Sequence, residues 1–385
     1  MSFLPTEEQQ LAIDGLRKFL DREVEPQILP YLENGELIPT QKMKAIHKSL
    51  MEFGLVVAPF AEEVGGLGLD WVTQLMLFEE VVYTSIDLAV PIVINVVGID
   101  LLLAQASDAI KARYIPGLMS GDLMISVAIS EPDIGSDVAG VKTRAVRDGD
   151  DYIINGEKTW ISNGEYSDIL ICTARTGDGA GGLTHFLVDR EEHGYEVREI
   201  PKMAMNSQST AQIFLSDVRV PASNMIGGEG QGLKNTLVVF ERARLHMAAW
   251  GYGIARRALA ESVRYSKERI QHGKPIAGHQ LIAEKLATMA TEVDAARLLA
   301  LRAAEMIDRG IRCDKECSMA KWYGTELAAR AGRQAVQIHG GNGVTKEFVV
   351  ERLAREGIIA PIPDGTTEIQ KLIIARSLTG ISAIV

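Results

Sequence analysis

The chain has 385 residues, of which 46% are hydrophobic and 24% are charged, the balance of an ordinary globular protein. This length exceeds one ordinary hydrophobic core and indicates two or three packed units. The 40 basic and 51 acidic residues give a formal net charge of −11. That sign argues against a nucleic-acid-binding protein, because such proteins carry a basic face.

Cysteine usage and the N-terminal segment bear on the compartment. Cys172, Cys313 and Cys317 give no disulfide framework and fit a reducing compartment, and no ligand spacing predicts a metal site. The first ten residues show no basic segment followed by an apolar run, so no signal peptide is predicted. Residues 88–103 are the most apolar stretch, which we interpret as too short and too polar to span a bilayer. We therefore expect a cytoplasmic protein without a membrane partner.

The N-terminal third has a helical pattern. Thr6 followed by acidic residues is typical of a helix start, and an amphipathic stripe that includes Leu11 follows it. After a glycine-rich turn at residues 63–68, a helix is predicted from residue 71 to about residue 84. We expect residues 1–121 to form an N-terminal α-helical domain.

Between residues 122 and 232 short segments alternate apolar and polar residues, which predicts a middle β domain. The expected strands include residues 151–154, 158–161, 169–173, 185–188 and 212–215. Asn155-Gly156 lies between the first two segments and predicts a hairpin, because both residues tolerate the positive φ of a type I′ turn.

From residue 233 the pattern is helical again. Long helices are predicted at residues 233–270, 279–309 and 315–339, and their abundant alanine favours close packing. We expect residues 233–385 to form a C-terminal α-helical bundle. The fold class is therefore α+β, with ligands expected in clefts between the units.

Two polar stretches in the β region are candidates for ligand contact. Residues 129–137 (ISEPDIGSD) form a turn rich in hydroxyls and backbone donors, which can hold a flavin edge or a phosphate. Residues 159–164 (TWISNG) present an aromatic face and a hydroxyl on the same side of a strand. Taken alone, the first is also compatible with any polar loop, and the second with a core tryptophan beside an exposed serine.

Three further stretches lie at expected helix ends. Arg269, in residues 266–276, can reach a pyrophosphate with its planar guanidinium. The glycines of residues 337–343 (QIHGGNG) allow close approach to a ligand, although they also favour an ordinary helix cap. In residues 363–370 (PDGTTEIQ), Asp364 is typical of a helix N-cap.

Together, in this order and spacing, these stretches resemble the acyl-CoA dehydrogenase family over nearly the whole chain. The resemblance implies the family fold: an N-terminal helical domain, a middle β-barrel-like domain and a C-terminal helical bundle, with FAD between the last two. It implies that Val127, Ile129, Ser130, Trp160 and Ser162 line the flavin, and that Thr366 and Glu368 touch the cofactor.

The resemblance also implies contacts with a second copy and with the substrate. Arg269, His272, Gln280, Gln337 and Gly341 are expected to hold the adenosine diphosphate arm of the FAD of a neighbouring subunit, which implies a homo-oligomer, usually a tetramer. Ser136 and Arg244 are expected to contact the CoA part of the substrate, and Gly365 to contact the substrate beside the base.

The catalytic base of the family directly precedes a Gly-Thr pair and is usually glutamate. Here it is Asp364, one methylene shorter, so that its reach falls by about 1.5 Å. Some members carry the base on an earlier helix, at a position that corresponds here to Ala243, which cannot act. Glu241 is nearby, but two residues along a helix point its side chain elsewhere. Asp364 is therefore the predicted base.

By this resemblance the protein removes a proton from Cα and a hydride from Cβ of an acyl-CoA, and the hydride passes to flavin N5. Hydrogen bonds to the thioester oxygen, from the base residue's own N–H and a flavin ribityl hydroxyl, stabilise the developing enolate. Desolvation is expected to raise the pKa of the base. Reduced flavin is expected to pass its electrons to an electron-transfer flavoprotein.

The acyl group is less well determined. An aspartate at position 364 resembles the members that act on alicyclic substrates such as cyclohexanecarboxyl-CoA, and short or branched acyl groups are the alternative. Two other classes use the same scaffold: a flavin monooxygenase or oxidase, and a non-catalytic flavin scaffold. Ser136, Arg244 and a carboxylate at position 364 argue against the first class. An aspartate at position 364, in place of a residue such as alanine that cannot act as a base, argues against the second.

Overall fold

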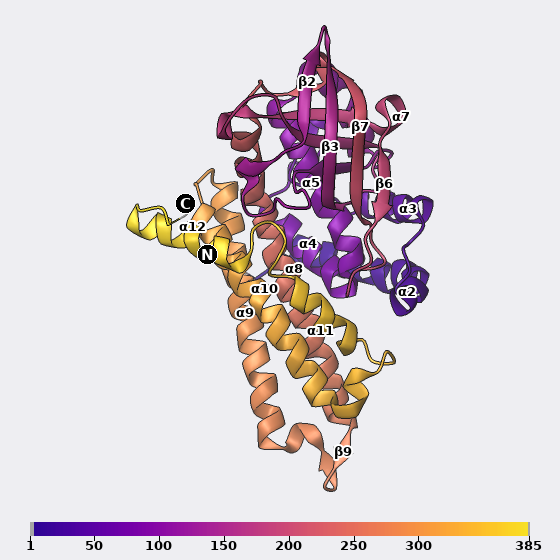
Figure 1. Cartoon of the computed structure of the whole chain (residues 1–385). Helices are drawn as coiled ribbons and strands as arrows, with labels where there is room; N and C mark the ends of the chain where they lie inside the picture. The colour runs from indigo at the N-terminus through magenta and orange to yellow at the C-terminus, as the bar shows by residue number, and fades with distance from the viewer. Residues whose placement is uncertain (1–3, 384–385) are drawn as a thin grey trace.

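The computed structural model describes residues 4–383, apart from the side chains of residues 180, 238, 239 and 241. Helices, a β domain and a helical bundle follow one another along the chain. Figure 1 shows the β domain at one end of the molecule and the long bundle helices running away from it. The predicted order, helices followed by a β domain and a helical bundle, is therefore confirmed.

The first helix begins where the sequence predicts. Thr6 Oγ1 accepts a hydrogen bond from Gln9 N (3.2 Å), and Gln9 Oε1 accepts one from Thr6 N (2.9 Å), which together form a capping box. Ile13 and Leu16 are buried, whereas Leu11 is 73% exposed, so the expected stripe is wrong at Leu11. The N-terminal helices are α1 (Glu7–Phe19), the π-helical turn Leu20–Val24, α2 (Glu25–Asn34), α3 (Thr40–Met51), α4 (Trp71–Thr84), α5 (Ile86–Gln105) and α6 (Asp108–Met119).

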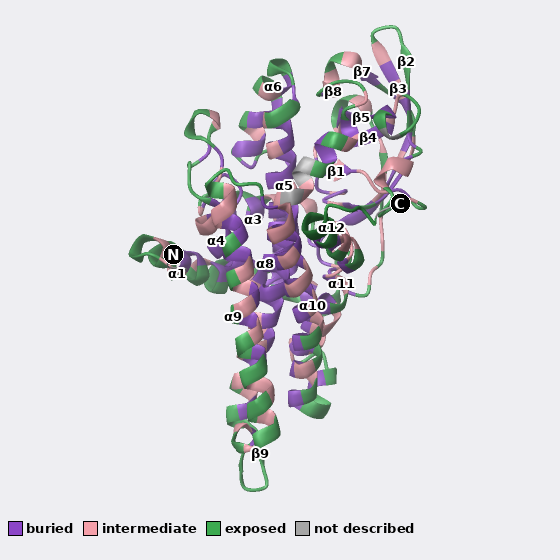
Figure 2. Cartoon of the chain, turned by 90° about the vertical axis from the view of Figure 1, so that its left-hand side faces the viewer, coloured by how far each residue is buried: buried purple, intermediate pink, exposed green. Residues whose placement is uncertain are grey.

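Helix α5 corrects the interpretation of the apolar stretch at residues 88–103. It has 20 residues and, among the described helices, is the one that is long and apolar enough to cross a membrane by length and composition. Most of it is buried inside the protein, against α8, α6 and β1 (Figure 2). This internal position accounts for its composition.

The β domain has one mixed sheet and its own apolar core. The strand order is β6-β7-β3-β2-β4-β5-β8, and β1 pairs in parallel with β4. The elements are β1 (Ile125–Ala128), β2 (Arg144–Asp148), β3 (Asp151–Ser162), β4 (Ile169–Arg175), β5 (Leu183–Asp189), α7 (Arg190–His193), β6 (Glu196–Glu199), β7 (Thr210–Pro221) and β8 (Met225–Ile226).

The hairpin predicted at Asn155-Gly156 is wrong. Strand β3 runs through both residues, and the chain reverses at residues 149–150, between β2 and β3. Asn155 exchanges hydrogen bonds with Asp217 on β7, because its Nδ2 donates to Oδ1 (3.0 Å) and its Oδ1 accepts from Asp217 N (2.8 Å). Gly156 permits a close approach, since a Cβ there would lie 2.3 Å from Thr143 Oγ1.

The long bundle helices begin and end within two residues of their predicted bounds. They are α8 (Gly232–Glu268), α9 (Gln280–Asp308) and α10 (Asp314–His339), followed by α11 (Val350–Ile359) and α12 (Thr367–Thr379); the short strands β9 (Ile270–Gln271) and β10 (Lys274–Pro275) link α8 to α9. Cys313, the N-cap residue of α10, and Cys317, in its first turn, are buried, with their Sγ atoms 3.7 Å apart and no disulfide between them.

Helices α8 and α10 are in close contact at a pair of glycines. A Cβ built on Gly251 would lie 2.2 Å from the carbonyl carbon and oxygen of Gly324, a distance that no side chain can tolerate. The two backbones therefore touch directly. This contact fixes how the faces of α8 and α10 lie relative to each other.

The substitution Gly251→Ala is expected to destabilise the protein by about 1–3 kcal/mol or more, because the new methyl group meets helix backbone that cannot move aside alone. Gly15→Ala in α1 is the matched control: nothing lies within 4 Å of a Cβ there, and the change is expected to stabilise the helix by up to about 1 kcal/mol. Thermal melting followed by circular dichroism measures both. A Gly251→Ala variant that melts no lower than the wild type would contradict the contact.

Candidate functional site

The structure brings the two polar stretches, residues 129–137 and 159–164, together at one edge of the β domain, where the chain leaving β1 meets β3. Thr159 N donates to Ser130 O (3.0 Å), and Lys158 Nζ donates to Ile129 O (3.0 Å). The segment that follows β1 therefore lies beside the second half of β3. Val127, Ile129 and Ser130, predicted to line the flavin, are all partly buried along this edge.

Trp160 is the most distinctive residue of this edge. Its side chain is 61% exposed and its φ is +61°, an unusual conformation for a bulky residue that costs on the order of 1–3 kcal/mol. The register of β3 against β7 is irregular between Lys158 and Ile161, so Trp160 is turned outward while Lys158 stays buried. Ser162 follows it, and its carbonyl accepts a hydrogen bond from Ser126 Oγ (2.9 Å).

These features fit the flavin that the resemblance implies. A flat aromatic cofactor needs an exposed aromatic or apolar face with polar groups at its rim, and an exposed indole followed by a serine provides both. The strained backbone at Trp160 is the kind of feature that concentrates at ligand sites. The edge formed by β1 and β3 is thus a suitable platform for the ring system of FAD.

A buried ion pair supports this edge from beneath. Lys158 Nζ lies 2.9 Å from Glu131 Oε1, and both side chains are almost fully buried. Glu131 also accepts hydrogen bonds from the main-chain nitrogens of Lys142 (2.7 Å) and Thr143 (2.8 Å). Burial acts to raise the pKa of Glu131, but Lys158 and these hydrogen bonds hold it below its ordinary value. Ser136 lies exposed on the loop that these contacts anchor.

Asp364 lies on the loop between α11 and α12. It is partly buried and has a φ of +54°, in the left-handed region, and Gly365 follows with a φ of +89°. The N-cap of α12 is Thr366, not Asp364, so the prediction that Asp364 caps this helix is wrong. The Asp364 carboxylate therefore does not serve as the N-cap of α12. Glu368 lies exposed in the first turn of the helix.

The surroundings of Asp364 change its acidity. Burial raises the pKa of the Asp364 carboxyl group above its ordinary value, while the positive charges of Lys321 and Arg244 oppose that rise. Arg244 is buried on α8. Ala243, beside it, is also buried and carries no acid–base group. The side chain of Glu241 lies outside the described residues.

Lys321, on α10, is a residue of this site that the sequence analysis missed. Its side chain has no exposed surface, and its Nζ donates to Pro361 O (3.0 Å) and Gly365 O (2.5 Å). Gln370 Nε2 donates to Asp364 O (3.2 Å) and to Gly365 O (2.8 Å). Nothing in the sequence marked Lys321, because a lone lysine in an alanine-rich helix is normally solvent-exposed.

The remaining predicted cofactor residues lie far from this edge, at the opposite end of the bundle. They are Arg269 at the end of α8, His272 in the turn between β9 and β10, Gln280 at the start of α9, and Gln337 and Gly341 at the end of α10; all are exposed. The rings of Tyr265 and His339 stack with centroids 4.2 Å apart, which joins the ends of α8 and α10. Figure 1 shows β9 at the tip of the bundle, with the β domain at the other end.

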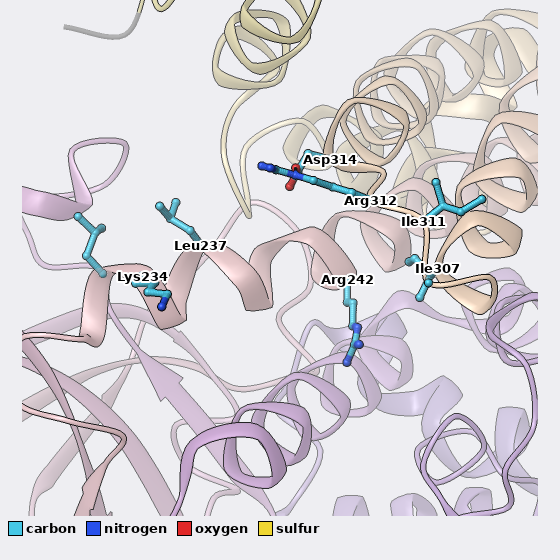
Figure 3. Close-up of a pocket in the computed structure, with 9 residues that line it drawn as sticks. Lys234, Leu237, Arg242, Ile307, Ile311, Arg312 and Asp314 are labelled. Atoms are coloured by element: carbon cyan, nitrogen blue, oxygen red, sulfur yellow. Dashed lines mark hydrogen bonds and ion pairs between the residues drawn. The ribbon is translucent and has the colours of Figure 1, made fainter.

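A cavity of about 660 Å³ lies beside the N-terminal part of α8 and the turn between α9 and α10 (Figure 3). Its volume is within the usual range of small-molecule sites. Its lining residues are Leu233, Lys234, Leu237, Arg242, Ile307, Gly310, Ile311, Arg312 and Asp314. Three of them are cationic, and Arg242 is two residues before Arg244 on the same helix. Among the described residues, no group of three or more His, Cys, Asp or Glu side chains is placed to hold a metal ion.

Comparison with known proteins extends over the whole chain. Sequence models of the acyl-CoA dehydrogenase N-terminal, middle and C-terminal domains match residues 6–122, 126–218 and 230–379, respectively. The probable acyl-CoA dehydrogenase YngJ of Bacillus subtilis is 38% identical over 384 residues, which cover 98% of this chain and 100% of that protein. The cyclohexane-1-carbonyl-CoA dehydrogenase of Syntrophus aciditrophicus is 33% identical over 377 residues, 97% of each chain.

Solved structures agree with the sequence comparison. Butyryl-CoA dehydrogenase from Megasphaera elsdenii superposes with a TM-score of 0.93 at 30% identity, covering 98% of this chain and 100% of that one. The identity and coverage exceed what a shared fold alone would give. The chain therefore belongs to the acyl-CoA dehydrogenase family and is an FAD-dependent oxidoreductase that acts on the CH–CH bond of acyl-CoA thioesters.

Proposed function

We propose that Asp364 is the base that removes the Cα proton of the acyl-CoA. The observation that carries this proposal is a partly buried carboxylate, held on a left-handed loop, whose pKa is raised by burial while Arg244 and Lys321 face it. A base works best when its pKa lies near the working pH, and burial moves an aspartate in that direction. Because Thr366 caps α12, the carboxylate is available for this task.

The other residues of the site have binding and orienting tasks. When bound, FAD supplies the hydride acceptor at flavin N5. Trp160 and the hydroxyl of Ser162 orient the ring system at the edge of the β domain. Arg244 and Ser136 bind the CoA part of the substrate. Arg244 is a buried cation on α8, and a guanidinium group suits the phosphates of the CoA arm.

The two ends of FAD are held by different copies of the chain in this proposal. The residues for the flavin ring and those for the adenosine diphosphate arm lie at opposite ends of one molecule (Figure 1). Large apolar side chains are also exposed near the distal end, including Ile270 (52%), Leu281 (76%) and Val344 (71%). Such a group of exposed apolar residues is typical of an interface. A homo-oligomer satisfies both observations, and the family resemblance indicates a tetramer.

The favoured substrate is an alicyclic acyl-CoA of the cyclohexanecarboxyl type. Two observations support it: the shortened base at position 364, and the 33% identity to a cyclohexane-1-carbonyl-CoA dehydrogenase over nearly the full length of both chains. A short or branched acyl-CoA is the alternative, supported by the fold shared with a butyryl-CoA dehydrogenase. An electron-transfer flavoprotein is the proposed acceptor, by analogy with the family.

The role of Asp364 can be tested by substitution. Asp364→Asn is expected to lower kcat by roughly 10²–10⁴-fold, because a neutral amide cannot accept the proton, while bound FAD is retained and the protein stays yellow. Asp150→Asn, which neutralises an exposed carboxylate in the β2–β3 turn, is the control and should leave turnover unchanged. Anaerobic reduction of the flavin by acyl-CoA measures both variants. Full activity in Asp364→Asn would rule out this base.

The pH dependence of turnover follows from the raised pKa. Asp364 acts only when ionised, so kcat should fall about tenfold per pH unit as the pH drops below the pKa of Asp364. Because burial raises that pKa, the acid limb is expected above the ordinary value of about 3.9 for an aspartate. A pH–rate profile at saturating acyl-CoA locates the limb. A limb at or below about pH 4 would contradict the assigned environment.

A substrate panel tests the acyl group. The value of kcat/KM is expected to be highest for cyclohexanecarboxyl-CoA, ahead of isobutyryl-CoA, butyryl-CoA and octanoyl-CoA, with electron transfer to a flavoprotein or artificial acceptor as the readout. Preference for a linear acyl-CoA would defeat the alicyclic assignment. Rapid oxygen consumption without any CoA thioester would instead support a monooxygenase or oxidase.

A further inference from the structure

Lys321 occupies an unusual position for a charged residue. It lies about two turns into α10 with no exposed side-chain surface, and its ammonium group reaches the loop between α11 and α12. There it donates to the carbonyl oxygens of Pro361 (3.0 Å) and Gly365 (2.5 Å). These two carbonyls stand on either side of Asp364 in the sequence. A single ammonium group therefore ties together both ends of the segment that carries the carboxylate.

This segment needs such support. Asp364 has a left-handed backbone (φ +54°), which costs on the order of 1–3 kcal/mol unless its surroundings impose it. Gln370 holds the same segment from the side of α12 through Asp364 O and Gly365 O. Gln370 is neutral, however, and its two hydrogen bonds go to Asp364 O and Gly365 O, so that it holds one end of the segment. Lys321 differs from it because it joins both ends and brings a positive charge.

Burial of the Lys321 ammonium group is energetically unfavourable. Burial lowers the pKa of Lys321 to about 8, and the carboxylate of Asp364 acts in the opposite direction, as do Glu326 on α10 and Glu368 on α12. Arg244 on α8 adds to the lowering. A buried charge is weak support for stability, because an apolar residue of similar size is often as stable. A lysine at this position is better explained by what it does to Asp364.

We propose that Lys321 is a positioning residue for the base: its ammonium group fixes the 361–365 segment and keeps the Asp364 carboxylate ionised and aimed at the substrate. The inference rests on the proposed function, in which Asp364 removes the α proton. Lys321 does not touch the substrate in this arrangement. Its effect on the reaction passes through the backbone that it holds and through the charge that it places near Asp364.

The test uses two substitutions in the FAD-loaded enzyme. Lys321→Met removes both the hydrogen bonds and the charge, and Lys321→Gln removes the charge but keeps an N–H donor. Lys202→Met is the matched control, because Lys202 is a partly buried lysine that donates to a backbone carbonyl, Gln208 O (3.2 Å), outside this site. Should Lys321→Met fail to fold, Lys321→Gln carries the same test.

Two readouts separate positioning from a merely structural role. Loss of the positive charge should raise the pKa of Asp364, so the acid limb of kcat is expected to move up by about one pH unit or more in both Lys321 variants. Hydrogen exchange of the backbone amides of Ile362, Asp364, Gly365 and Thr366, followed by mass spectrometry, is expected to be at least tenfold faster in Lys321→Met. Lys202→Met should change neither quantity. The value of kcat should fall more than KM rises, because the aim of the base matters in the transition state.

The proposal is overturned if the acid limb stays at its wild-type pH in both Lys321 variants, or if these four amides exchange as slowly in Lys321→Met as in the wild type. Reduced melting temperature or flavin content without either change would show a structural role only, and would also overturn it. Asp364→Asn keeps the two hypotheses apart. Full turnover in Asp364→Asn would rule out the proposed base itself. Loss of turnover in Asp364→Asn, together with an unshifted acid limb in the Lys321 variants, would overturn only the positioning role of Lys321.

Discussion

The site depends on a carboxylate that is partly removed from water while two buried cations face it. A buried aspartate alone would bind a proton too tightly to act as a base at neutral pH, and an exposed one would bind it too weakly. Arg244 and Lys321 counteract the effect of burial on Asp364. Because the two cations come from different helices, the acidity of Asp364 is a property of the packed bundle and not of its own loop.

The packing of α8 against α10 sets the positions of both cations. Gly251 lies seven residues after Arg244 on α8, and Gly324 lies three residues after Lys321 on α10, so each glycine is on the same face of its helix as the cation. The direct backbone contact at the glycines leaves little freedom for the two faces to slide or separate. Gly251 and Gly324 thereby fix where the side chains of Arg244 and Lys321 meet the loop between α11 and α12, which carries Asp364.

The sequence could predict features that repeat along one element, but not features that arise between elements. The helix from Trp71 to Thr84 has the expected bounds because its periodicity is strong and its cap, Asp70, is local. Asn155-Gly156 has the local composition of a turn, yet pairing with β7 kept it in the strand. Lys321 carried no local signal, since its burial results from the return of residues 361–365 over α10.

The separation of the predicted FAD residues has a thermodynamic consequence. If the ring is bound at the β domain of one copy and the adenosine diphosphate arm at the bundle tip of another, neither copy alone offers the whole binding energy. Cofactor binding and association are then linked, and each strengthens the other by the same free energy. A change at Arg269 or Gln337 would weaken cofactor binding at a site whose chemistry resides on a different copy. In such an assembly the apolar side chains exposed at the bundle tip would contribute to the same equilibrium, because their burial between copies would favour association.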